Sequence, residues 1–305
     1  MSKLLNLAEV DCIFLSYDEP NADKNYADLL NKAPWAKRVH GVKGSDAAHK
    51  ACARLSETEY FITVDGDNII DPAFFNLQID LDKLKYKDKT QFSWAGRNII
   101  NGLVYGNGGL KCWTKEFVLN MKTHEDAENE TNQVDFCWQD NYVQMADCYS
   151  EVHNNASPLQ AWRAGFREGV KMTLNRGLKQ SLINAKLQLG LRNYRRLLMW
   201  CSVGADVENG SWAILGARQG AYKTNCTDWN HVQVRDFDHL NALFEEWKDC
   251  NPIDTSKKFG DDLRFKLNLP IADIDSSSSK FFREIFVNPP RTNTALTEKE
   301  VTWDL

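Results

Sequence analysis

The chain has 305 residues, 43% hydrophobic and 26% charged, with a net charge of −5, which is the size and composition of an ordinary globular protein with one large domain or a domain and an appendage. No apolar stretch is long enough to span a bilayer and no signal-peptide core is present, so we expect a cytoplasmic protein with no membrane partner. The eight cysteines form no Cys-x-x-Cys pair, which argues against a zinc site and a disulfide framework.

The first sixty-five residues predict half of a nucleotide-binding α/β fold. The predicted elements are a strand over 10–15, a helix over 22–32, a strand over 37–42, a helix over 47–55 and a strand over 60–64. Ser45 or Asp46 is the predicted N-cap of the second helix. This β-α-β-α-β order requires right-handed crossovers and a largely parallel sheet.

Two carboxylates follow the third strand, in Asp65-Gly66-Asp67. In open α/β folds, ligands bind at the carboxyl ends of parallel strands, and Gly66 permits a tight turn there. Two neighbouring carboxylates repel each other unless a cation or hydrogen-bond donors compensate them. The cation expected to bind between them is therefore Mg²⁺ or Mn²⁺. The alternative is a turn whose aspartates hydrogen-bond the local backbone.

Three glycines, Gly106, Gly108 and Gly109, lie between Tyr105 and Lys111. They either let the backbone approach an anionic ligand or form a hairpin turn, for which Asn-Gly between strand formers is a strong signal. A helix is predicted over 115–121. The acidic stretch 125–130 that follows is predicted to be a loop that could serve as a lid.

Asp140 and His153 are the next candidates for chemistry. Asp140 lies among aromatic residues, where a carboxylate with a tuned pKa can act as a general base; the alternative is a helix N-cap. His153 is either an ordinary surface or core histidine or a ligand for Mn²⁺.

The segment 161–200 carries nine Lys and Arg against one acid, Glu168, so it has a net charge of +8 and the remainder has −13. Phe166, Val170, Leu174, Leu178 and Leu182 recur at near-helical spacing, which predicts one or two amphipathic helices with a basic outer face. Such a face is either simply solvated or binds a polyanion, namely donor phosphates or a nucleic-acid backbone.

The last third carries fewer signals. Residues 236–247 predict an amphipathic helix, and the tail 288–305 is expected to lie irregularly on the surface. Trp162, Trp200, Trp212 and Trp229 are expected in the core rather than as platforms for base stacking.

Over about residues 8–165, the chain resembles GT-A glycosyltransferases. The resemblance is carried, in order, by Ser16-Tyr17-Asp18-Glu19, the Ala-rich helix 46–53, Asp65-Gly66-Asp67, Gly108-Gly109, Gln139-Asp140 and His153. It implies an α/β fold with a Rossmann-like, mostly parallel sheet flanked by helices, and a mainly helical C-terminal extension. The parts expected are a nucleotide-sugar-binding catalytic domain over 1–160, a basic helical region over 161–287 for acceptor binding or bracing, and the surface tail 288–305.

The resemblance also implies roles for individual residues. Asp67 and His153 would hold Mn²⁺ or Mg²⁺ at the donor diphosphate, Asp65 would hold the ribose or a metal-bound water, and Asp140 would be the base of an inverting enzyme. The implied donor-binding residues are Ser16, Tyr17, Asp18, Asp46, Lys50, Asp65, Gly66, Asp67, Gly108, Gly109 and Arg163. Gln160-x-x-Arg163 is similar to part of a motif of processive members, but Ala164 replaces the Trp expected next, so processivity is not implied.

More narrowly, the segments 64–68, 105–111, 161–171 and 200–204 are similar to glycosyltransferases of bacteriophages that hypermodify their DNA, in the group that puts arabinose on 5-hydroxymethylcytosine. This implies UDP-arabinose as the UDP-sugar donor, double-stranded DNA containing 5-hydroxymethylcytosine as the acceptor, and the host cytoplasm as the location. The DNA-contacting residues expected are Arg167, Lys171, Arg176, Lys179, Arg195 and Arg196.

Three other functions stay open. A glycosyltransferase could act on a glycan or another non-DNA acceptor. A nucleotidyltransferase would need a Gly-rich, Lys/Arg-containing phosphate loop after the first strand, which Ser16 to Asn21 does not provide. A non-catalytic DNA-binding protein would keep the basic segment but tolerate loss of Asp67.

Overall fold

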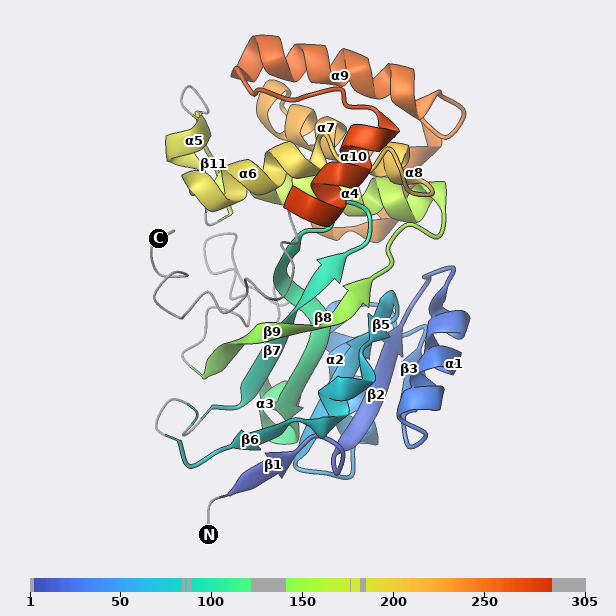
Figure 1. Ribbon diagram of the computed structural model, residues 1–305, viewed down its shortest axis with the longest axis vertical. Coiled ribbons are helices and arrows are strands. Elements are labelled where there is room, and N and C mark those ends of the chain that lie inside the picture. The colour runs from blue at the N-terminus through green and yellow to red at the C-terminus, as the bar shows by residue number, and fades with distance from the viewer. Residues whose placement is uncertain are drawn as a thin grey trace. The chain divides into compact units, whose positions relative to one another are not determined.

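The computed structural model describes residues 3–83, 86, 89–121, 141–175, 177–181 and 185–286, with the backbone alone at 107, 285 and 286. The chain forms two compact units (Figure 1). The first contains Met1–Arg97 and Val104–His153, and the second contains Asn98–Leu103 and Asn154–Leu305. The sequence analysis expects the first domain to end at residue 160, and in the structure the chain passes into the second unit after His153. The roles assigned to the two regions stay predictions, and the tail 288–305 lies outside the described residues.

The first unit consists of strands with short helices between them. Its elements are β1 Leu4–Asn6, β2 Asp11–Ser16, α1 Ala22–Lys32, β3 Lys37–His40, α2 Ser45–Leu55, β4 Tyr60–Asp65, β5 Asn68–Ile70, the 3₁₀ turn η1 Pro72–Asn76, β6 Gln78–Asp80, β7 Gln91–Asn98, β8 Val104–Thr114, α3 Lys115–Asn120 and β9 Tyr142–Val152. The predicted helix 22–32 is confirmed. The predicted N-cap of α2 is wrong, because Gly44, at φ +92°, precedes a helix that already begins at Ser45.

Seven strands form the main sheet, in the order β3-β2-β4-β8-β7-β9-β5. β2 pairs in parallel with both β3 and β4, as the βαβ pattern predicts. The pairs β4 with β8, β7 with β8 and β5 with β9 are antiparallel. The α/β class with flanking helices and a helical C-terminal part is therefore confirmed, but the sheet is mixed rather than mostly parallel. The second half of the sheet is built from long antiparallel strands, which need no crossover helix.

Side chains alternate between the two faces of the sheet, as strand geometry requires. Phe14 and Val64 lie in one buried cluster, together with Leu29 of α1 and Phe74 of η1. Ile13 and Phe61 belong to a second cluster with residues of α2 and α3. The central strands are thus covered on both faces, which explains their continuous apolar runs.

The glycines of 105–111 do not form a hairpin turn, because they lie inside β8. Trp94 pairs with Leu110 and Gly96 with Tyr105, so residues 106–109 bulge out opposite the single residue Ala95. A Cβ on Gly108 would lie 2.0 Å from the backbone nitrogen of Gly96. The bulge therefore needs small residues where the two strands come closest.

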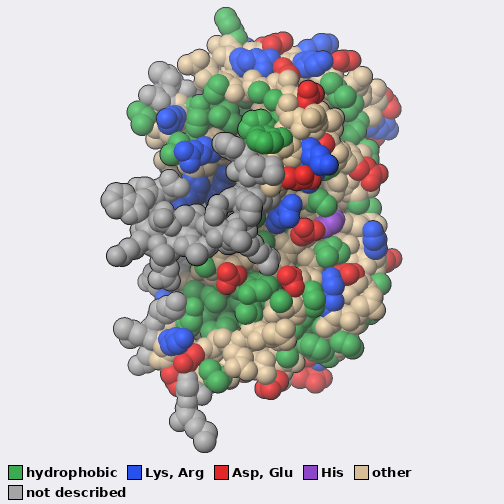
Figure 2. All heavy atoms as spheres, in the orientation of Figure 1, with side chains coloured by type: hydrophobic (Ala, Val, Ile, Leu, Met, Phe, Trp, Pro, Cys, Tyr) green, Lys and Arg blue, Asp and Glu red, His purple; other side chains and the backbone are tan. Residues whose placement is uncertain are grey.

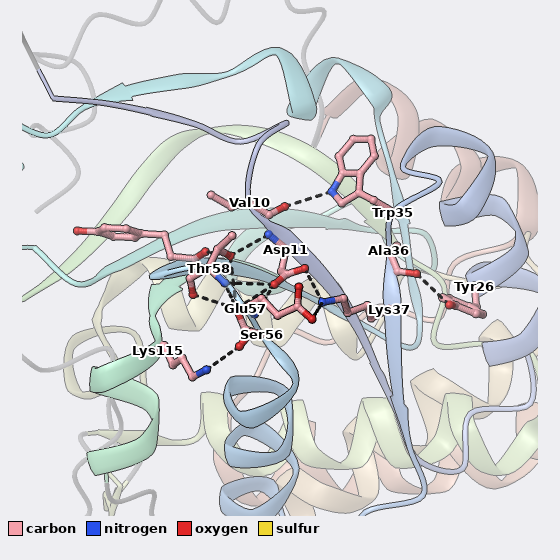
Figure 3. Close-up of polar contacts among 11 residues, drawn as sticks. Val10, Asp11, Tyr26, Trp35, Ala36, Lys37, Ser56, Glu57, Thr58 and Lys115 are labelled. Atoms are coloured by element: carbon pink, nitrogen blue, oxygen red, sulfur yellow. Dashed lines mark hydrogen bonds and ion pairs between the residues drawn. The ribbon is translucent and has the colours of Figure 1, made fainter.

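Asp11 ties together the amino ends of three neighbouring strands (Figure 3). Its carboxylate accepts hydrogen bonds from the backbone N–H groups of Glu57 and Thr58, and lies 2.9 Å from Nζ of Lys37. Burial alone would raise the pKa of Asp11, but these hydrogen bonds and the charge of Lys37 bring that pKa below its usual value. The carboxylate thus fixes the start of β2 against β3 and β4.

The second unit is mainly helical. Its elements are α4 Pro158–Met172, β10 Leu174–Asn175, β11 Leu178–Lys179, α5 Ala185–Gln188, α6 Gly190–Trp200, α7 Gly210–Cys226, the 3₁₀ turn η4 His231–Arg235, α8 Phe237–Glu245, α9 Pro252–Leu267, α10 Ser276–Phe281 and the π-helical turn η5 Phe282–Phe286. Leu174 and Leu178 continue the helical spacing of α4 but lie in a hairpin, because Gly177, at φ +80°, lies in the turn between its strands. Helices are confirmed on either side of this hairpin.

Helices α4 and α7 cross with their backbones in contact. A Cβ on Gly165 or Gly169 of α4 would lie 1.9 or 2.1 Å from a carbonyl oxygen of α7. On α7, a Cβ on Gly216 or Gly220 would lie 2.1 or 2.2 Å from a carbonyl oxygen of α4. Two Gly-x-x-x-Gly pairs therefore face each other, the arrangement that allows the closest helix packing. Trp162 and Trp200 are buried, as predicted for the core.

The buried guanidinium of Arg218 joins α7 to three other segments. It donates hydrogen bonds to the carbonyl oxygens of Cys201 and Ser256, and pairs with the carboxylate of Asp273 at 2.6 Å. A buried arginine with several partners is costly to remove, because those partners are left unsatisfied. Within the described ranges, every helix is too short or too polar to cross a lipid bilayer.

Replacing Asp11 by Ala is expected to lower the free energy of unfolding by about 2 kcal/mol, because the N–H groups of Glu57 and Thr58 lose a charged acceptor and Lys37 loses its ion-pair partner. The contribution of Asp11 is present above about pH 4, the unfolded pKa, and is lost as the pH falls through the lower folded pKa. Urea unfolding at pH 7 and pH 3 measures both effects. Asp28→Ala, which breaks only the partly exposed i,i+4 pair with Lys32, should cost less than about 0.5 kcal/mol.

Gly165→Ala should destabilise the second unit by at least about 3 kcal/mol, since the added methyl group meets a backbone carbonyl that cannot move aside. An ordinary helical Gly→Ala change stabilises by up to about 1 kcal/mol, so the sign of the effect is diagnostic. Thermal unfolding measures it. The exposed Lys257→Ala on α9 should change stability by less than about 0.5 kcal/mol, and a stable Gly165→Ala protein would contradict the backbone contact.

Candidate active site

The Asp65-Gly66-Asp67 turn lies where β4 ends and β5 begins. Hydrogen bonds from Asn25 and His153 to backbone carbonyls of the turn hold it in place, and Asn21 holds His153 in turn. Nδ2 of the buried Asn25 on α1 donates to the Gly66 carbonyl at 2.9 Å, and the His153 N–H donates to the Asp67 carbonyl at 2.7 Å. Asn21 Nδ2 in turn donates to the His153 carbonyl at 2.8 Å. The start of α1 and the end of β9 are thus both attached to the turn that sequence reasoning singled out.

Two glycines let other segments approach the two aspartates. A Cβ on Gly66 would lie 2.7 Å from Oε2 of Glu19, and φ at Gly66 is not positive, so the glycine is required for space rather than for turn geometry. A Cβ on Gly109, at φ +79°, would lie 2.8 Å from Cβ of Asp65. The bulge of β8 therefore packs directly against Asp65. Gly109 thus lies beside Asp65, and its role in donor binding stays a prediction.

Three acidic side chains gather at the turn. Burial and then the negative charges of Asp65 and Glu19 raise the pKa of Asp67 to about 7. Burial also raises the pKa of Glu19, with smaller contributions from Asp65 and Asp18, against the lowering effect of the Tyr17 N–H, which donates to Glu19 at 2.7 Å. The carboxylates therefore repel one another, and their charges are incompletely compensated by the protein.

These groups fit a hard divalent cation. Oδ1 of the buried Asn68 has no hydrogen-bond partner among the described residues, while its Nδ2 donates to Asp67 at 2.9 Å. Within the same residues, no three His, Cys, Asp or Glu side chains are arranged to hold a metal by themselves. Mg²⁺ is commonly held by one or two carboxylates, with substrate phosphates and water as the other ligands. Asp65 and Asp67 match that requirement.

The side chain of His153 lies beside Glu151, with 3.3 Å between Nε2 and Oε2. This contact is the first cause of the lowered pKa of Glu151, and Arg97 contributes further. The structure thus brings the backbone of His153 to Asp67 while its imidazole contacts a carboxylate of β9. Its predicted role as a metal ligand stays a prediction.

A second set of polar side chains, those of Asp46, His49 and Lys50, lies in the first half of α2. Lys50 pairs with Asp46 at 2.6 Å, so these two predicted donor-binding residues lie together. The imidazole of His49 is buried, 5.3 Å edge-on from the ring of Trp113, and its Nε2 has no hydrogen-bond partner in the described part of the chain. Burial and the charge of the buried Lys111 lower the pKa of His49, against the opposing charges of Asp65 and Asp46.

The loop after β2 carries the other predicted donor-binding residues. Ser16 is buried, and its hydroxyl lies 3.0 Å from both Nδ1 of His40 and Nε of Arg38. Tyr17 is exposed, which leaves its ring accessible to a flat ligand. Asp18 is exposed next to it and contributes to the raised pKa of Glu19.

The predicted cations of α4 lie in the second unit. Arg163 is buried, with its guanidinium 4.3 Å from the centre of the Phe237 ring and 3.2 Å from Oδ1 of Asn241. Arg167 lies over the same ring at 4.8 Å, and Lys171 pairs with Glu168 at 3.2 Å. These three cations have structural partners rather than a free basic face. The predicted base Asp140, the lid 125–130 and Arg176 lie outside the described residues.

Sequence reasoning assigned no role to five residues of the site, namely Glu19, Asn25, His49, Asn68 and Lys111, although Glu19, Asn68 and Lys111 lie in segments that carry the resemblance. Two of them occupy positions that the sequence pattern could have identified. Asn25 lies on the buried stripe of α1 with Ala22 and Leu29, and His49 lies on that of α2. A polar residue in an apolar stripe must find a partner, so it indicates a functional or bridging position.

Comparison with known proteins adds little. No family model matches the chain, and no curated protein matches its sequence. A solved glycosyltransferase involved in the glycosylation of the major capsid of PBCV-1 is 11% identical, over 48% of this chain and 94% of that chain, with a TM-score of 0.30. HddC from Yersinia pseudotuberculosis is 15% identical, over 45% of this chain and 69% of that chain, with a TM-score of 0.26. Likenesses this distant carry no argument about activity, donor or acceptor.

Asp67→Asn should stabilise the metal-free protein at pH 8. The folded pKa of about 7 lies above the unfolded value near 4, so the carboxyl costs stability as the pH rises from about 4 to 7, and that cost stays constant above pH 7. We expect a gain of about 1–2 kcal/mol at pH 8 that shrinks toward pH 5, after allowance for solvent screening. Thermal unfolding in EDTA at the two pH values measures it. A gain of equal size at both would show that the charge of Asp67 is not responsible.

Proposed function

We propose that this protein is a metal-dependent, inverting glycosyltransferase that moves a sugar from a UDP-sugar, with arabinose as the proposed sugar, to the hydroxymethyl group of 5-hydroxymethylcytosine in DNA. The acidic cluster at the carboxyl end of β4 carries the proposal. Asp65, Asp67 and Glu19 repel one another in the protein alone, and Asn68 offers a further oxygen. A site built this way is suited to a cation and the diphosphate that accompanies it.

In this proposal, the donor occupies the edge formed by the ends of β2 and β4. Asp67 and Asp65 would hold Mg²⁺ or Mn²⁺, and the exposed ring of Tyr17 would lie against the uracil. When bound, the cation would stabilise the negative charge of the leaving diphosphate. The bulge at Gly109 supports this placement, because it brings backbone rather than a side chain up to Asp65.

The transfer itself needs a base and a leaving group. The acceptor hydroxyl oxygen attacks the anomeric carbon, the bond from that carbon to the β-phosphate oxygen breaks, and Asp140 takes the hydroxyl proton. One displacement of this kind inverts the anomeric configuration. The assignment of Asp140 rests on its place in the sequence resemblance.

DNA as the acceptor is supported by the charge distribution. The segment 161–200 is strongly basic in a chain that is otherwise acidic, and a polyanion is the partner that such an asymmetry favours. The hydroxymethyl group of the modified cytosine lies in the major groove, where a bound enzyme can reach it with or without flipping the base.

The test is mass analysis of nucleosides from 5-hydroxymethylcytosine DNA after incubation with the protein, Mn²⁺ and a panel of UDP-sugars that includes UDP-arabinose. We expect a pentose-sized gain in mass that is abolished by EDTA. Asp67→Ala should reduce the rate at least about 100-fold, the loss typical of removing a group that stabilises charge in the transition state.

Asp28→Ala, which removes a partly exposed acid from α1 of the same unit, should leave the rate unchanged. Release of UDP from one donor without transfer to DNA would keep the glycosyltransferase and replace the acceptor by a glycan or another hydroxyl compound. Absence of any metal-dependent UDP release would contradict the proposed reaction, and DNA binding that is unaffected by Asp67→Ala would then favour a non-catalytic DNA-binding protein.

A further inference from the structure

The second unit contains a long stretch without acidic residues. Between Gly169 and Ala205 there are seven Lys and Arg and no Asp or Glu. In the described part of this stretch, the hairpin of β10 and β11 is followed by α5 and α6. A surface built from such a segment has no internal counter-charge, so its cations must be compensated by solvent ions or by a partner.

Five of the described cations of this stretch are exposed, and four of them lie beyond α4: Lys179 on β11, Lys186 on α5, and Arg192 and Arg195 on α6. Lys171, by contrast, pairs with Glu168, and Arg167 lies over Phe237. The basic surface available to a partner is therefore the hairpin with α5 and α6, rather than α4. Arg192 and Arg195 are three residues apart, which places them on the same side of α6.

Two leucines are exposed among these cations. Leu178 precedes Lys179 and is 62% exposed, while Leu187 follows Lys186 and is 77% exposed. Fully burying an exposed leucine gains about 1.5–3 kcal/mol, so two largely exposed leucines beside four cations indicate a surface that becomes covered.

The elements that carry these residues are joined. Asn175 Nδ2 of β10 donates to the carbonyl of Gln188 in α5 at 3.3 Å, and α5 contacts α6. His231 Nε2 lies 3.1 Å from the Gly177 carbonyl in the hairpin turn, which attaches the turn to η4. Figures 1 and 2 show these elements at one edge of the second unit, at the upper left, where Lys and Arg side chains lie beside hydrophobic ones.

We propose that this surface binds double-stranded DNA by pairing its cations with phosphates and inserting its leucines between bases. We call it the basic hairpin face, and its residues are Leu178, Lys179, Lys186, Leu187, Arg192 and Arg195. Apolar side chains inserted at a base step unstack it and bend the duplex toward a larger protein contact. The inference deepens the proposed function and rests on it for the identity of the acceptor, but the binding itself can be measured without donor, metal or modified base.

The shape of the surface favours DNA over an anionic membrane. A helix that lies in a membrane interface presents a continuous apolar face. In α6 the apolar residues Leu197 and Trp200 are already buried in the protein, and among the described residues of the hairpin, α5 and α6 the exposed large apolar side chains are the separate Leu178 and Leu187. On DNA, a single apolar side chain can insert at one base step while the cations around it pair with the phosphates on either side of that step.

The test uses the full chain in EDTA and a 20-base-pair duplex of unmodified sequence, with 2-aminopurine at several internal positions. Fluorescence anisotropy should show binding that weakens with salt, with a slope of log K against log[salt] of about −3 to −4 for four phosphate contacts. The 2-aminopurine fluorescence should rise on binding, because unstacked 2-aminopurine is brighter.

Two double variants separate the contributions of charge and insertion. Arg192→Glu with Arg195→Glu should weaken binding at least about 10-fold at 100 mM salt and reduce the slope by about 2. Leu178→Ser with Leu187→Ser should retain the slope but lose the rise in 2-aminopurine fluorescence. The matched control is Lys257→Glu with Lys258→Glu, which makes the same charge change at exposed positions of α9 and should leave binding within about 2-fold of wild type.

The proposal is overturned if the arginine variant and the α9 control lose affinity equally, or if wild-type binding leaves 2-aminopurine fluorescence unchanged. Binding to vesicles with 30% phosphatidylserine, together with no binding to the duplex, would overturn it in favour of a membrane. A protein that releases UDP from a donor but fails the duplex assay refutes this inference alone. One that binds the duplex as described but transfers no sugar refutes the proposed reaction alone.

Discussion

The repulsion among three carboxylates at the end of β4 is the constraint that explains most of the first unit. Asp65 and Asp67 follow the central parallel strand directly, and Glu19 meets them because Gly66 leaves no side chain between. Left alone, such a turn would open. It is held by hydrogen bonds to its backbone from α1 and from β9, so the side chains stay close while their charges disfavour it. The fold thus maintains an arrangement of carboxylates that is unfavourable in the protein alone, which is what the proposed cation site requires.

In the second unit, the constraint is steric rather than electrostatic. The backbones of α4 and α7 touch through paired glycines, which fixes α4 without relying on side-chain interlocking. Two cations of α4 also have partners within the protein, since the guanidinium groups of Arg163 and Arg167 both lie over the ring of Phe237. The cations that remain for a partner lie beyond the end of this helix, where the hairpin begins at Leu174.

Sequence alone predicted the parts of this structure that depend on local patterns. The helix 22–32 and the strand leading to Asp65 follow from apolar spacing and were found. The antiparallel half of the sheet was not predicted, because strand direction depends on pairings between distant segments that no local pattern encodes. The glycines of β8 were assigned to a turn or a ligand loop, and their bulge follows only from the register with β7. The spacing of Leu174 and Leu178 continues that of α4, although the helix itself ends at Met172 and the two leucines lie in the hairpin that turns at Gly177.

The composition of the site also bears on the order in which its ligands bind. Two protein carboxylates supply too few ligands to hold Mg²⁺ tightly on their own, and the described residues contain no third acidic or imidazole group arranged to join them. A diphosphate would add the missing oxygens, and the cation in turn would offset the repulsion between Asp67 and Glu19 that a bare diphosphate would increase. Each ligand therefore lowers the cost of binding the other, which is positive coupling in the thermodynamic sense. In the proposed function, cation and donor would therefore bind together, and the repulsion among the carboxylates of the metal-free protein would be the source of that coupling.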